Sequence, residues 1–292
     1  MSIPAIVNPA AGNAAAASAA LGAAGFDVRE VAPAGIEGVV RSLVNEGARR
    51  IVVAGGDGTI GTAASVLAHS PCELAVIPGG TLNHFAKDHG IPEALEEAVQ
   101  LAATGVARPV DVATVSGRIF LNTSTVGAYV AMVRQRELLE RHLGYRLATV
   151  IAAFRSFLVL RAFDLTVEIE GTTRRYRTPL LFVGVGEREL RVPILGGRLP
   201  EGKRALHLLV PRSRGRRAML SLALAAFARG TEHVSAGSEL DAYLVDRCTV
   251  VLRRRGPVGL DGEIVRLDTP LEYRLLPGAL SLVTGPTPRT SV

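Results

Sequence analysis

The first 108 residues alternate between short, continuous apolar runs and segments whose apolar residues recur at helical spacing. Apolar runs without polar interruptions are typical of strands that are buried on both faces of a sheet. We expect strands at 4–7, 26–32, 49–56 and 73–80, and helices at 14–24, 36–46, 59–68, 82–89 and 92–104. This order predicts an α/β domain with a parallel sheet that helices cover on both faces.

The pattern changes after Arg108, where polar and glycine-rich turns separate the strand-like segments. Strands are expected at 111–115, 118–123, 165–170, 174–183, 205–210, 248–253 and 271–276, and helical stretches at 131–160 and 214–228. These segments predict a mainly antiparallel β domain over residues 109–277. Residues 279–284 form a final apolar strand that can rejoin the first domain, which then comprises residues 1–108 and 278–292.

Composition restricts the class of protein. The 292 residues suffice for two domains, and the content of 48% hydrophobic and 21% charged residues excludes a disordered chain. The longest apolar runs fall short of the roughly 18–20 residues that span a bilayer, and the N-terminus lacks the basic and apolar regions of a secretory signal. Cys72 and Cys248 lie far apart in sequence and form neither a CxxC pair nor a cluster of metal ligands. We therefore expect a cytoplasmic protein without a disulfide framework.

Basic charge is concentrated in the second half of the chain. Residues 1–146 hold 11 Lys+Arg and 13 Asp+Glu, whereas residues 147–292 hold 22 and 14, with arginine runs at 212–217 and 253–255. A basic face suits nucleic acid or an anionic membrane, or is simply solvated. Few aromatic residues interleave the charge, which disfavours nucleic acid. We therefore expect peripheral attachment to the inner face of the membrane, and leave the formation of a homodimer open.

A glycine-rich segment, GGDGT at 55–59, ends the strand expected at 49–56. Glycines allow backbone N–H groups to approach a phosphate closely, and the N-terminus of the following helix adds donors. Asp57 is placed to bind a Mg²⁺ ion that bridges phosphates. A tight turn with a side-chain cap explains the same residues equally well.

Two further loops repeat this layout. GGTLN at 79–83 follows the next strand; we expect Thr81 to cap a helix and donate to a phosphate, and Asn83 to bind nucleotide or loop backbone. NPAAG at 8–12 follows the first strand. An ordinary turn explains each loop alone, but the repetition favours a nucleotide site. The candidate ATP-binding residues are Asn8, Gly12, Gly55, Gly56, Asp57, Gly58, Thr59, Gly79, Gly80, Thr81 and Asn83.

The segments NPAAG, VVAGGDGTI, PGGTLNHFAKDHGIP and GLDGE together resemble the diacylglycerol kinase catalytic-domain family of bacterial lipid kinases. This family is related to sphingosine and ceramide kinases and, more distantly, to NAD kinases. The resemblance extends from Asn8 to the C-terminal strand. It implies a Rossmann-like nucleotide domain followed by a β-sandwich domain, with ATP and Mg²⁺ in the cleft between them. It also implies transfer of the γ-phosphate to the hydroxyl of a lipid alcohol such as diacylglycerol, in phospholipid biosynthesis.

The motif GLDGE at 259–263 contains the remaining catalytic candidates. The resemblance implies that Asp261 is needed for phosphoryl transfer, because a carboxylate beside the acceptor hydroxyl can accept or orient its proton. Glu263 is expected to hold Mg²⁺ or the loop. Taken alone, Asp-Gly is typical of a hairpin turn. The catalytic candidates are thus Asp57, Asp261 and Glu263.

The resemblance is incomplete over residues 183–202, where the family's Asn-Gly pair and Asp-Gly turn are replaced by VGVGERE and PEG. We therefore do not expect the structural Mg²⁺ site that some relatives have there. Two alternatives stay open. A NAD kinase-like enzyme should carry an Asn-Glu pair in its second domain to grip a ribose, and the second half of this chain has none. A non-catalytic nucleotide- or lipid-binding regulatory protein would share the fold.

Overall fold

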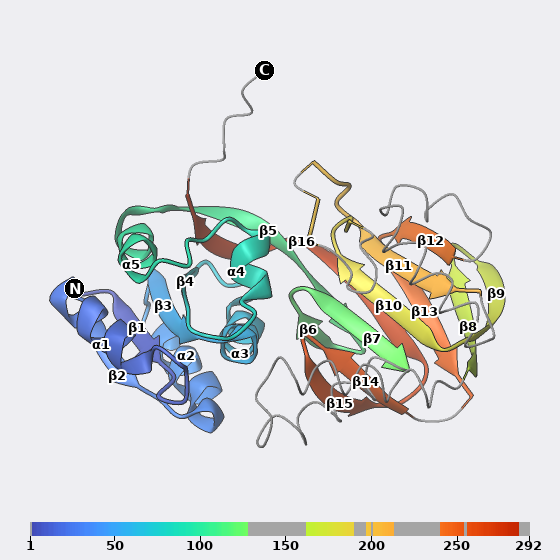
Figure 1. Cartoon of the computed structure of the whole chain (residues 1–292), viewed down its shortest axis with the longest axis horizontal. Coiled ribbons are helices and arrows are strands. Elements are labelled where there is room, and N and C mark those ends of the chain that lie inside the picture. The colour runs from blue at the N-terminus through green and yellow to red at the C-terminus, as the bar shows by residue number, and fades with distance from the viewer. Residues whose placement is uncertain are drawn as a thin grey trace, which may run out of the picture. The chain divides into compact units, whose positions relative to one another are not determined.

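The chain divides into two compact units, shown in Figure 1. The computed structural model describes residues 2–127, 162–189, 197–199, 201–212, 240–253 and 256–285. Unit 1 comprises residues 1–112 and 276–292, and unit 2 comprises residues 113–275, whereas the sequence placed the boundaries after 108 and 277. The helices expected at 131–160 and 214–228 lie outside the described residues. Two strands, β5 (Val106–Val115) and β16 (Leu271–Thr284), run from one unit into the other.

Unit 1 is built on a parallel sheet with the strand order β2-β1-β3-β4. The last part of β16 extends this sheet, where Leu282 pairs in parallel with Leu74. The strands are β1 (Pro4–Val7), β2 (Asp27–Glu30), β3 (Arg50–Gly55) and β4 (Glu73–Pro78). The helices are α1 (Ala14–Ala23), the short 3-10 helix η1 (Pro33–Gly35), α2 (Ile36–Asn45), α3 (Asp57–Leu67), α4 (His84–Asp88) and α5 (Leu95–Thr104). The predicted parallel α/β domain is confirmed.

Burial on both faces explains why these strands are continuously apolar. Residues 51–54 of β3 are fully buried. Helices α1 and α5 pack on one face of the sheet, and α2 and α3 pack together against the other. Helix α2 buries Ile36, Val40 and Leu43, whose spacing places one apolar stripe against the sheet.

Unit 2 consists of antiparallel sheets. One has the order β12-β11-β10-β7-β14-β15, and the other has the order β16-β13-β8-β9. The first contains β7 (Thr123–Gly127), β10 (Leu180–Val185), β11 (Leu206–Pro211), β12 (Leu240–Val245), β14 (Gly256–Leu260) and β15 (Glu263–Leu267). The second contains β8 (Phe163–Ile169), β9 (Thr172–Thr178), β13 (Arg247–Leu252) and the start of β16, while β6 (Arg118–Phe120) pairs with β5. The predicted antiparallel β domain is confirmed.

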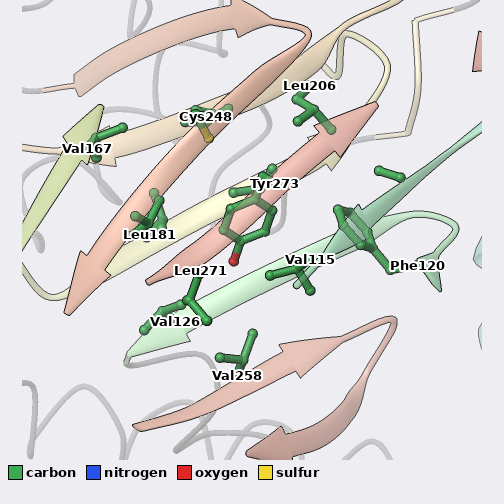
Figure 2. Packing of buried hydrophobic residues seen from close by; sticks show 14 of the residues in the cluster. Val115, Phe120, Val126, Val167, Leu181, Leu206, Cys248, Val258, Leu271 and Tyr273 are labelled. Carbon is green, nitrogen blue, oxygen red and sulfur yellow. The ribbon is translucent and has the colours of Figure 1, made fainter. Parts of the chain in front are cut away.

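The inner faces of these sheets enclose one apolar core, part of which is shown in Figure 2. Tyr273 of β16 lies in this core and meets Phe120 edge to face, with 6.3 Å between the ring centroids. The Tyr273 hydroxyl lies 3.0 Å from that of Ser124, which satisfies both polar groups inside the core. Both cysteines are free and buried, and burial raises the pKa of Cys72 to about 11 and that of Cys248 to about 12.

Three expectations about the strands differ from the structure. The strand expected at 118–123 is two strands, β6 and β7, which belong to different sheets. The single strand expected at 174–183 is two strands, β9 and β10, which belong to different sheets. Pro179 separates them, because proline cannot donate to a sheet ladder. The two strands expected at 271–276 and 279–284 are one unbroken strand, β16. Its Pro-Gly step is tolerated because Gly278 adopts φ +61° and donates its N–H to the buried carboxylate of Asp111 on β5.

His207 on β11 gives unit 2 a testable pH dependence. The side chain is buried, and Nδ1 accepts the backbone N–H of Arg188 at 3.1 Å. Burial is the main reason why the pKa of His207 is lowered from its ordinary value of 6.5; the charge of Glu187 opposes this shift, and the charge of Arg188 adds to it. The unfolded state therefore binds more protons below about pH 6.5, so stability present above that pH is lost as the pH falls.

We expect His207→Asn to flatten this dependence, because asparagine keeps an acceptor near Nδ1 but does not titrate. Denaturant unfolding between about pH 7 and about pH 5 should show a steeper loss of stability for the wild type than for the variant. Equal slopes for the two proteins would mean that His207 does not contribute.

Candidate nucleotide site and the Asp261 hairpin

In the parallel sheet of unit 1, the direction in which successive strands are added reverses between the neighbouring strands β1 and β3. The chain passes from β1 outward to β2, then returns to β3 on the other side of β1 and continues to β4. In open α/β sheets, ligands bind outside the carboxyl ends of the strands at such a reversal point. The predicted glycine loops follow β1, β3 and β4, so they gather at this edge of the sheet.

Hydrogen bonds join the three loops, defined here as the first loop (residues 8–13), the second loop (residues 55–59) and the third loop (residues 79–83). Asn8 Nδ2 donates to Thr59 Oγ1 at 2.8 Å, which links the first loop to the second. Gly12 N–H donates to the carbonyl of Gly79 at 3.2 Å, and Gly79 N–H donates to the carbonyl of Gly55 at 2.9 Å. The sequence candidates of unit 1 are therefore brought together in one cluster.

Asp57 connects the second loop to helix α4. Its two carboxylate oxygens accept the backbone N–H groups of His84 at 3.2 Å and Phe85 at 3.1 Å. The predicted cap of this helix, Thr81, is exposed, and α4 begins later than expected, with Asn83 in a left-handed conformation at its N-cap. The capping prediction for Thr81 was wrong because a carboxylate distant in sequence satisfies these donors.

The glycines of these loops have a packing function that was not predicted from the sequence. A Cβ on Gly80 would lie 2.7 Å from the Cα of Gly56, and a Cβ on Gly79 would lie 2.5 Å from Asn13 Oδ1. A Cβ on Gly55 would lie 2.6 Å from the Thr59 side chain. Glycine is thus required here for the loops to touch, and their contact places several backbone N–H groups at one edge of the sheet.

The helices that follow the first two loops begin without side-chain caps. Helix α3 has Gly56 at its N-cap, and neither α3 nor α1 has a capping hydrogen bond from a side chain. The N–H groups in the first turn of a helix lack intrahelical partners, and the helix dipole favours negative charge there. Two such helix ends next to glycine loops are suited to the phosphates of a nucleotide.

Asn13 also belongs to this cluster, although it is not among the ATP-binding residues predicted from the sequence. Asn13 Nδ2 donates to the carbonyl of Pro78 at 2.9 Å and so joins the first loop to the end of β4. Its Oδ1 atom is buried without a hydrogen-bond partner. An asparagine immediately before a helix was the available signal, because this residue type is favoured at the N-cap.

In unit 2, Asp261 lies in the two-residue turn between β14 and β15. Asp261 and Gly262 have φ of +48° and +90°, as in a type I′ hairpin turn. The Asp261 carboxylate accepts three consecutive backbone N–H groups, from Leu121 at 2.6 Å, Asn122 at 2.8 Å and Thr123 at 2.8 Å. It therefore holds the connection from β6 to β7. This contact, between residues about 140 positions apart, was not predicted.

Glu263 is exposed at the start of β15, where it pairs with Leu260. In the residue ranges that the structure describes, no group of three or more His, Cys, Asp or Glu side chains could hold a metal ion. The roles predicted for Asp57, Asp261 and Glu263 stay predictions.

Residues 3–115 match the family model of the diacylglycerol kinase catalytic domain. Over this stretch the chain is similar to the diacylglycerol kinase catalytic-domain family. The match contains all three loops, so the loop cluster at the strand reversal lies within the region that is similar to this family.

Curated relatives match over shorter stretches of their own length. A Pseudomonas putida protein named "Probable lipid kinase YegS-like" is 36% identical over 167 residues, which cover 55% of this chain and 55% of that protein. A protein of the same name from Pseudomonas aeruginosa is 43% identical over 98 residues, covering 31% of this chain and 32% of that protein. The aligned region thus spans about half of these relatives or less.

Solved structures extend the likeness of fold to nearly the whole chain. A structure from Bacillus anthracis strain Sterne aligns with a TM-score of 0.73 at 23% identity, covering 98% of this chain and 97% of that chain. Another from the same organism, whose title names diacylglycerol kinases, aligns with a TM-score of 0.69 at 22% identity, with the same coverage. Both units therefore share the fold of these proteins.

Proposed function

We propose that the protein is an ATP-dependent lipid kinase that transfers the γ-phosphate of ATP to the hydroxyl of a lipid alcohol such as diacylglycerol. The observation that carries this proposal is the joining of three glycine-containing loops at a strand reversal, within the region that matches the diacylglycerol kinase family model. The names of the curated relatives support lipid as the acceptor class.

The residues of unit 1 fit a nucleotide with its metal. The first turn of α3 offers backbone donors to phosphate oxygens, and the second and third loops would surround them. Each carboxylate oxygen of Asp57 accepts one N–H, which leaves lone pairs for a cation. Mg²⁺ commonly combines one or two carboxylates with substrate phosphates, so it would arrive with ATP. Bound Mg-ATP would supply the phosphoryl group and neutralise its charge.

Asp261 and Glu263 are proposed to serve the acceptor. Asp261 would act on the acceptor hydroxyl or hold residues 121–123 in place for it, and its three backbone bonds support the second role. A positioned carboxylate that accepts a proton typically contributes about 10²–10⁴-fold to the rate. Glu263, which is exposed on the same hairpin, would bind Mg²⁺ or hold the loop in place.

We also propose peripheral attachment to an anionic membrane. The second half of the chain carries 22 basic and 14 acidic residues. Within the described ranges, no helix has the length and apolar character needed to cross a membrane.

The proposed activity predicts phosphate transfer from γ-labelled ATP to a lipid alcohol in mixed vesicles. We expect labelled product with diacylglycerol, ceramide or sphingosine but not with soluble NAD, and loss of product when Mg²⁺ is chelated. Product formation from each acceptor would be followed by separating the lipid phase. Phosphorylation of NAD alone would identify a NAD kinase-like enzyme, and ATP binding without transfer to any acceptor would identify a non-catalytic protein.

A further inference from the structure

Strand β9 is the last strand in the order β16-β13-β8-β9 and has the sequence TTRRYRT. Arg174, Arg175 and Arg177 on this strand are exposed. Because side chains alternate along a strand, Arg175 and Arg177 lie on one face of the sheet, while Arg174 and Tyr176 lie on the other. Charged side chains on an edge strand can serve only to prevent pairing with the strands of other chains. That protective role does not explain the two cavities that these arginines line.

On the Tyr176 face, a polar network positions two arginines. The Tyr176 hydroxyl donates to Asp241 at 2.9 Å and lies 2.6 Å from the Tyr243 hydroxyl. The Arg174 guanidinium lies 5.4 Å from the centroid of the Tyr243 ring, and Arg212 forms an ion pair with Asp241 at 2.6 Å. A cavity of about 440 Å³ is lined by Arg174, Arg175, Tyr176, Arg177, Arg212 and Asp241.

The opposite face of β9 has a second basic cavity. It measures about 400 Å³ and is bordered by Arg175, Arg177 and Arg253, together with Asp164 and Val251. Asp164 is shared between Arg177 at 3.5 Å and Arg253 at 3.9 Å. Val251 is 44% exposed, which places an aliphatic side chain beside the arginines.

Charge on this surface is unbalanced. The two cavities contain five arginines but two aspartates, and each aspartate already pairs with an arginine. Within the described part of the chain, no carboxylate forms an ion pair with Arg174 or Arg175. Arginine offers a planar fork of donors that matches phosphate oxygens. Phosphate groups are therefore the ligand chemistry that fits both cavities.

We propose that the β9 arginine surface, defined as Arg174, Arg175, Arg177, Arg212 and Arg253, docks the protein on an anionic phospholipid bilayer. A bilayer presents many phosphates at once, so both cavities can be occupied together and the binding is multivalent. Nucleic acid fits less well because both tyrosine hydroxyls are hydrogen-bonded and the tyrosines pack against the core instead of offering stacking platforms. The inference rests on the proposed function, which supplies a membrane-resident substrate.

The test is co-sedimentation with vesicles of phosphatidylcholine alone or mixed with phosphatidylglycerol, in the absence of ATP. We expect salt-sensitive binding to the mixed vesicles only. Arg175→Gln should weaken that binding about fivefold, and the double change Arg175→Gln with Arg177→Gln about 25-fold. Arg175→Lys, which keeps the charge, should retain most of the binding and so separates loss of charge from loss of fold.

Arg266→Gln is the matched control, because Arg266 is an exposed arginine of the same unit on β15. Its binding should stay within about twofold of the wild type, and an equal loss for Arg266→Gln and Arg175→Gln would overturn the proposal in favour of net charge alone. Calorimetry with inorganic phosphate and with a single-stranded oligonucleotide provides two further arms. Binding of either one, without binding to mixed vesicles, would also overturn it.

Failure of the kinase proposal can be distinguished from failure of the docking proposal by measuring phosphate transfer as well as vesicle binding. Transfer to a dispersed short-chain diacylglycerol, without vesicles, should be unchanged in the Arg175→Gln variant. If no acceptor is phosphorylated but vesicle binding still depends on Arg175, the docking surface stands and the kinase proposal fails.

Discussion

Asp261→Asn is expected to destabilise unit 2 as well as to reduce any transfer activity. Asparagine adopts the left-handed conformation as readily as aspartate and is favoured before glycine in a type I′ turn, so the hairpin itself should survive. However, the side chain loses the negative charge that accepts the backbone hydrogen bonds. One amide N–H of the new side chain would also face a backbone donor among Leu121, Asn122 and Thr123. An unsatisfied donor of this kind costs about 1–3 kcal/mol.

A loss of about 2 kcal/mol corresponds to a fall in Tm of about 4–8 °C for a unit of this size. Calorimetry would measure this fall, and Glu263→Gln is the control because it neutralises an exposed carboxylate on the same hairpin. We expect the control to stay within about 0.5 kcal/mol of the wild type. An unchanged Tm for Asp261→Asn, combined with a loss of transfer, would show that the carboxylate acts in the chemistry and does not mainly hold the backbone.

Gly80→Ala is expected to disrupt the loop cluster of unit 1. The added methyl group would lie 2.7 Å from the Cα of Gly56 and 3.0 Å from Asn83 Oδ1. The first neighbour is backbone and cannot move aside cheaply, so the second and third loops must separate. Overpacking of this kind typically costs about 1–3 kcal/mol. Because the proposed site depends on contact between these loops, ATP affinity measured by calorimetry should fall at least about tenfold, the equivalent of about 1.4 kcal/mol.

Gly61→Ala is the matched control for Gly80→Ala, and Gly12→Ala tests a candidate ATP-binding residue. A Cβ on Gly61, inside α3, meets nothing within 4 Å, so Gly61→Ala should leave ATP binding unchanged and raise stability by about 0.5–1 kcal/mol. A Cβ on Gly12 meets only the Gly79 carbonyl oxygen at 3.9 Å, so this change should not alter stability. Weaker ATP binding by Gly12→Ala at unchanged Tm would place Gly12 against the nucleotide. Unchanged Tm and ATP affinity for Gly80→Ala would refute the packing argument.

Local pattern was enough to predict most elements of unit 1. Continuous apolar strands ended by glycine, and helices with one apolar stripe, are determined by neighbours in the sequence. For this reason the expected bounds of β1, β3 and α2 lie within one residue of the observed ones. The pattern of apolar and polar residues over 174–183 did not show that two strands are present. The chain crosses there from one sheet to the other at Pro179.

The chemistry of the candidate residues depended on contacts that no sequence spacing contains. The glycines, Asp57 and Asp261 could be selected as candidate site residues because their residue types and positions after strands or in turns are local features. Their partners are not local: Asp57 caps a helix 27 positions away, and Asp261 holds a backbone segment 138–140 positions away. The sequence by itself determined which residues lie at strand ends and turns. Only the tertiary structure decided which donors those residues satisfy, because that depends on how the strands are ordered in each sheet.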